Sequence, residues 1–106
     1  LDYLSEGINA YVPLAGSNAL SSLPVVPGSH LWHDCVIPHT APGAAINGVA
    51  YTVPSVLPGD APLHMTRPTV AIGEIMLFSP WLLHGGAVNF NADTTRVSLE
   101  MRFWKQ

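Results

Sequence analysis

The sequence predicts an all-β domain, a sandwich or jelly roll, on three observations. No segment of useful length repeats its apolar residues every 3.6 positions, as an amphipathic helix would. Short runs rich in β-branched and aromatic residues alternate with turn signals, the arrangement typical of β-sandwiches and jelly rolls. Ten prolines and nine glycines also favour turns over long helices. At 106 residues, the chain is expected to form one domain at most, residues 1–106.

The expected strands are short, and several end at a recognisable signal. Residues 8–14 (INAYVPL) are predicted to form a strand that Pro13 either places at a sheet edge or ends. Residues 23–26 (LPVV) are closed by the turn dipeptide Pro27-Gly28. Further strands are expected at residues 49–53, 64–72, 74–79, 87–90 and 94–104.

The composition limits the possible partners. A net charge of −3 without a basic cluster gives no reason to expect nucleic acid, and no apolar run approaches the roughly 20 residues of a membrane helix. Charged residues make up only 10% of the chain, against about 25% in a typical domain, which suggests burial against a partner or self-association. The lone Cys35 excludes an internal disulfide, and with no visible signal peptide we predict a cytoplasmic location.

The last predicted strand has one apolar and one polar face. Thr95, Val97, Leu99, Met101 and Phe103 alternate with Thr94, Arg96, Ser98, Glu100 and Arg102. In an ordinary half-exposed sheet the polar face meets water. In a barrel-like fold the same face would line a lumen that holds a charged ligand, and alternation alone leaves both interpretations open.

Three residues of this region are candidates for a binding site. His84 ends an apolar run and precedes Gly85-Gly86, where an imidazole could ligate a divalent metal. Arg96 and Ser98 share a strand face, and a guanidinium with a hydroxyl suits a carboxylate. Each also has an ordinary structural alternative, a packed histidine or a surface arginine beside a serine.

The irregular loop at residues 31–65 is long enough to be functional, and its Trp32 and Tyr51 could line a substrate pocket. Four potential metal ligands crowd the region where it begins: His30, His33, Asp34 and His39. No zinc-type spacing is present, so structural roles are favoured for them. Neither a cysteine nucleophile nor a serine triad is supported, since Cys35 has no evident base and no G-x-S-x-G motif occurs.

Two motifs together resemble the phytanoyl-CoA dioxygenase-like family. LPVVPGSH at residues 23–30 resembles the family's hydrophobic-hydrophobic-PGSH signature, and a strand precedes it as in that family. The later block GEIMLFSPWLLHGGAVNFNADTTRVSLEMRF is similar to the family's C-terminal core, with its Gly-Glu, His-Gly, Asn and Arg in order. The resemblance covers most of the chain and is loose between Trp32 and Thr69.

The resemblance implies a double-stranded β-helix, a cupin-like jelly roll, with non-haem Fe(II), 2-oxoglutarate and O₂ as cosubstrates. In such enzymes a His-x-Asp/Glu motif and a distal His hold the iron. His84 matches the distal ligand, Arg96 matches the arginine that binds the far carboxylate of 2-oxoglutarate, and Ser98 assists it.

The family's His-x-Asp/Glu motif does not occur in these 106 residues. Asp2 stands where the acidic ligand would fall, and the histidine would then lie one residue before Leu1. The chain is therefore expected to be a jelly-roll fragment, incomplete at its N-terminal side. An alternative is that His30, His33 or Asp34 supplies a replacement ligand.

Two functions remain open at this point. The chain is either part of an Fe(II)/2-oxoglutarate-dependent dioxygenase that hydroxylates a small molecule, or a non-catalytic jelly-roll remnant that binds a small ligand or serves a structural role. Unpaired sheet edges seek partners, so we also expect a homo-oligomer formed through an edge strand or through the apolar face of residues 97–101.

Overall fold

The computed structural model describes residues 6–32, 40–41, 43–46, 48–50, 56–57 and 63–106. These residues form β-strands, a single turn of 3-10 helix, η2 (Ser29–Leu31), and no α-helix, which confirms the all-β prediction. The chain divides into two compact units, Leu1–Leu31 with His64–Gln106 and, separately, Trp32–Leu63. No helix in the described part of the chain is long and apolar enough to cross a membrane.

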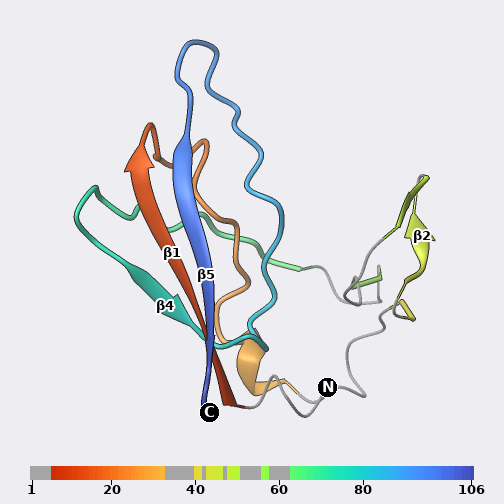
Figure 1. The fold of residues 1–106 in the computed structure, drawn as a ribbon. Coiled ribbons are helices and arrows are strands. Elements are labelled where there is room, and N and C mark those ends of the chain that lie inside the picture. The colour runs from red at the N-terminus through yellow and green to blue at the C-terminus, as the bar shows by residue number, and fades with distance from the viewer. Residues whose placement is uncertain (1–5, 33–39, 42, 47, 51–55, 58–62) are drawn as a thin grey trace. The chain divides into compact units, whose positions relative to one another are not determined.

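The first unit is organised around an antiparallel sheet of three strands (Figure 1). β1 (Gly7–Ala15) lies between β4 (Met76–Phe78) and β5 (Val97–Trp104). The register sets Asn9 opposite both Phe78 and Arg102. The predicted strands at residues 8–14, 74–79 and 94–104 are therefore present, the last two shorter than expected.

Pro13 does not place β1 at an edge of the sheet, as its sequence position suggested. β1 is the central strand, but β4 pairs only as far as Tyr11, so among the described residues β5 is the one strand that pairs with β1 at Pro13. The pairing with β5 then shifts register between Pro13 and Ala15. A proline lacks the N–H of a ladder bond, and a short neighbour followed by a bulge is where a sheet tolerates it.

The two faces of the sheet differ sharply. One face carries Asn9, Tyr11 and Pro13, all buried, and its register partners on β5 are the polar residues of the alternating pattern. Tyr11 packs with Leu23, Val25 and Val70 in the core, against which Met76 and Phe78 are partly buried. The opposite face is apolar, and apart from the buried Ala10 and the half-buried Val12 its large side chains are exposed. The polar face of β5 is thus on the core side of the sheet, although Glu100 and Arg102 remain exposed there.

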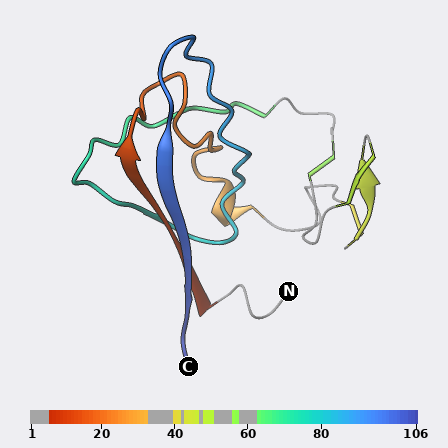
Figure 2. The ribbon, with the colours of Figure 1, turned by 45° about the horizontal axis from the view of Figure 1, so that its top comes forward.

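A second layer covers the core side of the sheet without forming continuous strands. Val25 makes antiparallel bridges to Thr66 on one side and to His84 on the other. Figures 1 and 2 both show residues 16–28 running beside residues 80–95, next to the sheet. The strands predicted at residues 23–26 and 64–72 are reduced to these bridges, and residues 87–90 are not a strand.

The second unit contains one short hairpin among its described residues. β2 (Ala45–Ile46) pairs with β3 (Val49–Ala50) in an antiparallel arrangement. The strand predicted at residues 49–53 is present at its first two residues, and the rest lies outside the described residues.

Candidate functional site

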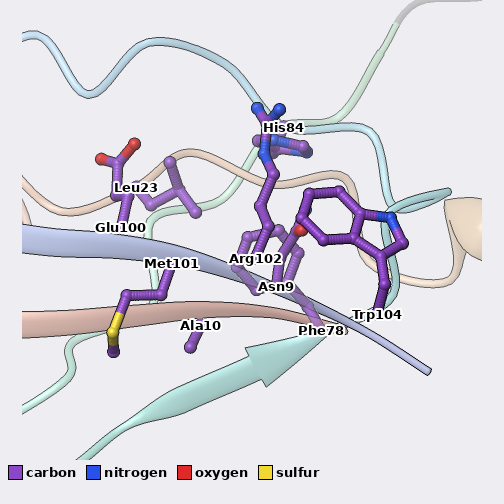
Figure 3. Close-up of a pocket in the computed structure, with 9 residues that line it drawn as sticks. All are labelled: Asn9, Ala10, Leu23, Phe78, His84, Glu100, Met101, Arg102 and Trp104. Carbon is purple, nitrogen blue, oxygen red and sulfur yellow. The ribbon is translucent and has the colours of Figure 1, made fainter. Parts of the chain in front are cut away.

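A pocket of about 440 Å³ lies on the core side of the sheet (Figure 3). Its polar lining comes from four side chains: Asn9, His84, Glu100 and Arg102. Phe78 and Trp104 supply aromatic surface and Leu23 aliphatic surface. Ala10 and Met101 also border the pocket, although their side chains leave the sheet on the opposite face. The volume falls within the range of small-molecule sites, roughly 300–1,000 Å³, and a few polar groups on an apolar lining is their usual composition.

His84 reaches this pocket because the PGSH segment fixes the backbone beside it. Val26, Pro27, Gly28 and Ser29 form a type II turn, with Gly28 at φ 78° and the Ser29 N–H donating to the Val26 carbonyl oxygen. The buried Ser29 hydroxyl then accepts the Leu83 N–H at 2.8 Å. The Val26 N–H donates to the Leu83 carbonyl oxygen, and Gly85 N–H to that of Pro24. The two sequence motifs therefore contact each other at His84.

The His84 ring is oriented by its neighbours. Its Nδ1 lies 2.7 Å from the Leu82 carbonyl oxygen, which can only accept, so Nδ1 carries the proton. Phe78 packs edge-on against the ring, with centroids 5.1 Å apart. A histidine that donates one ring N–H to a backbone carbonyl leaves Nε2 as a lone-pair donor, which is the common state of metal-binding histidines.

Ser29→Ala is expected to destabilise the chain by about 1–3 kcal/mol, because it removes a buried hydroxyl and leaves the half-buried Leu83 N–H without its acceptor. Urea denaturation measures the loss. Ser79→Ala is the matched control, because the Ser79 hydroxyl accepts only a local bond from the half-buried Trp81 N–H. Equal losses in the two variants would contradict the assigned role of Ser29.

Arg96 and Ser98 contact each other but do not line the pocket. Arg96 Nη1 donates to Ser98 Oγ at 3.1 Å and lies 4.0 Å from Glu100 Oε1. The Arg96 side chain is largely buried, 19% exposed. The predicted pair therefore forms, and Glu100, which is on the pocket lining, lies next to it.

Of the other predicted ligands, only His30 lies among the described residues. His30 is an exposed residue of η2. Asp2, His33, Asp34, Cys35 and His39 lie outside the described residues. Trp32 is exposed and is not part of the pocket lining, and Tyr51 is also outside the described residues. Where the structure describes the chain, no three His, Cys, Asp or Glu side chains cluster closely enough to hold a metal.

Sequence reasoning missed Asn9 and Arg102. Asn9 is 6% exposed, yet among the described residues its side-chain amide has no hydrogen-bond partner. Arg102 likewise has no ion pair in the described part of the chain. An asparagine inside a strand was the available signal, because asparagine is depleted in strands and this one pairs with the polar face of β5.

None of the protein-family models, curated proteins or solved structures compared with this chain matches it.

Proposed function

We propose that the chain carries the distal-histidine and cosubstrate part of a non-haem Fe(II)/2-oxoglutarate-dependent dioxygenase site, one that hydroxylates a small molecule. His84 is the iron ligand, and Arg96 with Ser98 receives the far carboxylate of 2-oxoglutarate. The observation that carries the proposal is the His84 ring, whose Nδ1–H is held by Leu82 and whose Nε2 is left free at a ligand-sized pocket.

The fold supports this assignment. A jelly roll needs two β-layers around one core. The sheet β4-β1-β5 is one layer, and the bridges from Val25 to Thr66 and His84 form the beginnings of a second layer over the same core. The proposed iron ligand lies in that second layer, facing Phe78 of the first.

The described residues fit part of the group. His84 suits one position of a facial triad, and the largely buried guanidinium of Arg96 suits a carboxylate. Asp2 is the proposed acidic ligand, and the chain has no His-x-Asp/Glu motif to complete the set. When bound, Fe(II) with 2-oxoglutarate supplies the oxidising chemistry, while residues such as these position the reactants.

The second candidate is a small-ligand-binding jelly-roll module without iron chemistry. It is favoured by the missing His-x-Asp/Glu motif and by a pocket whose polar groups suit an organic ligand without any metal. Homo-oligomerisation is compatible with both candidates.

Anaerobic titration with Fe(II) and 2-oxoglutarate tests the first candidate against the second. We expect a metal-to-ligand charge-transfer band with the unaltered chain, its loss in His84→Ala, and a weakened cosubstrate dependence in Arg96→Leu. His64→Ala is the matched control, because His64 is exposed and does not line the pocket. If the unaltered chain gives no band, the dioxygenase proposal fails for this chain and the binding module stands.

A further inference from the structure

We propose that the pocket binds a small organic carboxylate with an apolar or aromatic body, and that Arg102 and Asn9 hold its carboxylate. The proposal rests on the dioxygenase assignment only in naming this molecule as the substrate. The binding itself needs neither iron nor 2-oxoglutarate.

The first argument is the state of Asn9. Asn9 is 6% exposed and lines the pocket, and no hydrogen bond joins its side-chain amide to another described residue. The amide is not fully enclosed, since among the described residues the enclosed side-chain polar atom without a partner is Ser22 Oγ, so the Asn9 amide is open to the pocket. The amide can donate a hydrogen bond to an oxygen of a bound molecule.

The second argument is the charge at the same place. The register sets Arg102 directly opposite Asn9, so both side chains leave the sheet on the same face and at the same height. No acidic side chain among the described residues pairs with Arg102. A free guanidinium and an amide donor side by side form a receptor for a carboxylate.

The third argument is the position of the one acidic residue on the lining. Glu100 Oε1 lies 4.0 Å from Arg96 Nη1, so its charge is paired with a guanidinium that is not part of the pocket lining. In Figure 3 the Arg102 side chain rises on the side where His84 lies, and the Glu100 carboxylate stands apart from it. The Arg102 end is therefore the anion-binding end.

The rest of the lining selects the body of the ligand. Trp104 and Phe78 offer aromatic surface, and Leu23 adds aliphatic surface. His84 has only its Nε2 lone pair to offer, since its Nδ1–H is bound to Leu82. A carboxylate at Arg102 would thus present an apolar chain or ring to the aromatic residues, near the proposed iron ligand.

The test compares 3-phenylpropionate with its neutral amide, 3-phenylpropionamide, by calorimetry on the metal-free chain. We expect the carboxylate to bind about tenfold or more tightly than the amide, and Arg102→Gln to remove that preference. Lys105→Gln is the control, since it removes the same charge from an exposed residue that does not line the pocket. Equal affinities for the two compounds, or an unchanged preference in Arg102→Gln, would overturn the proposal.

Asn9→Leu separates binding from folding. Leucine has nearly the shape of asparagine and removes an amide that has no partner to lose, so we expect a melting temperature at least as high as that of the unaltered chain, together with several-fold weaker binding of 3-phenylpropionate. Weaker binding cannot then be blamed on unfolding. Unchanged binding in Asn9→Leu would remove Asn9 from the site and contradict the proposal.

The carboxylate-binding proposal and the dioxygenase proposal can fail independently, and the two experiments tell these failures apart. If carboxylate binding depends on Arg102 but no charge-transfer band forms, the pocket is a binding site and the enzyme assignment fails. If the band forms and the pocket does not distinguish the carboxylate from the amide, this inference fails alone. If the band forms and the pocket also prefers the carboxylate, 3-phenylpropionate is expected to perturb the charge-transfer band in the unaltered chain and not in Arg102→Gln. An unperturbed band in the unaltered chain would show that the carboxylate does not occupy the substrate position.

Discussion

If this chain forms the dimer that we propose, Leu99→Glu is expected to convert it into monomers. Leu99 lies on the exposed face of the sheet, where it is 48% exposed as a monomer. The neighbouring side chains on that face are also large, apolar and exposed: Ile8, Leu14, Leu77, Val97, Met101 and Phe103. None of these residues is charged, so nothing on the face opposes contact with another apolar surface.

The size of this face favours a second copy as its occupant. Seven large side chains, each between 36% and 65% exposed, offer several hundred Å² of apolar surface, at or above the largest patch of a typical monomer. A standard interface takes about 800 Å² from each partner. Two copies packed face to face would therefore cover one another's patch and approach that size, as the two sheets of a sandwich do.

The same strand offers an edge as well as a face. β5 is the longer of the two outer strands, and in the described residues it pairs only with β1. A glutamate at Leu99 disfavours the face contact, because a charge without a partner would be buried at its centre. We expect the dimer dissociation constant to rise at least a hundredfold, as measured by light scattering over tens to hundreds of micromolar.

Ala92→Glu is the charge-matched control, since Ala92 is exposed in the connection before β5 and away from the sheet face. It should leave the dimer intact. A monomeric unaltered chain at these concentrations would refute the proposal, and a Leu99→Glu variant that remains dimeric would assign the association to the open edge of β5 instead.

The sequence alone could not predict which of the two faces of β5 lies toward the core. Alternation identifies two faces, but which one is inside depends on what lies opposite. Here Leu23 and Val25 close the side that carries Tyr11, so Ser98 and Arg96 turn inward and Leu99 stays exposed. That choice is made by tertiary packing and leaves no local signal.

The strands predicted for the second layer are longer than those observed, and the sequence itself contains the reason. Val25 lies between Pro24 and Pro27, and Pro68 follows shortly after Thr66. Each proline removes a backbone donor, so the apolar runs there can form single bridges but no continuous ladder. Composition predicted extended chain correctly, and the prolines limited its pairing.

The residues of the candidate site could be predicted where a sequence motif contains them, but not where only the pairing register of two strands brings them together. His84 and the PGSH turn were both visible, and the contact between them follows from the Ser29 hydroxyl. Asn9 and Arg102 stand far apart in the sequence and meet only because β1 pairs with β5 in one register. A polar residue on a strand is ordinarily assigned to the solvent face, so neither stood out.

Gly16→Ala is expected to cost about 3 kcal/mol or more of the free energy of unfolding, enough to unfold a marginal domain. Gly16 follows β1 with φ 65°, a conformation that L-residues disfavour. A Cβ there would also run into the backbone carbonyl of Thr95, just before β5, which cannot move aside as a flexible side chain would. The Gly16 carbonyl oxygen further accepts the Ser21 hydroxyl at 2.9 Å, so the turn is held in place from both sides.

Gly28→Ala isolates the cost of the clash. Gly28 has a similar φ of 78°, and a Cβ there would meet nothing within 4 Å. We therefore expect a loss of about 1–2 kcal/mol from backbone strain alone. The difference between the two variants in urea denaturation measures the close approach of the end of β1 to the start of β5. If both variants lose equal stability, that approach is absent, and with it the geometry that sets Arg96 and Ser98 on the core side of the sheet.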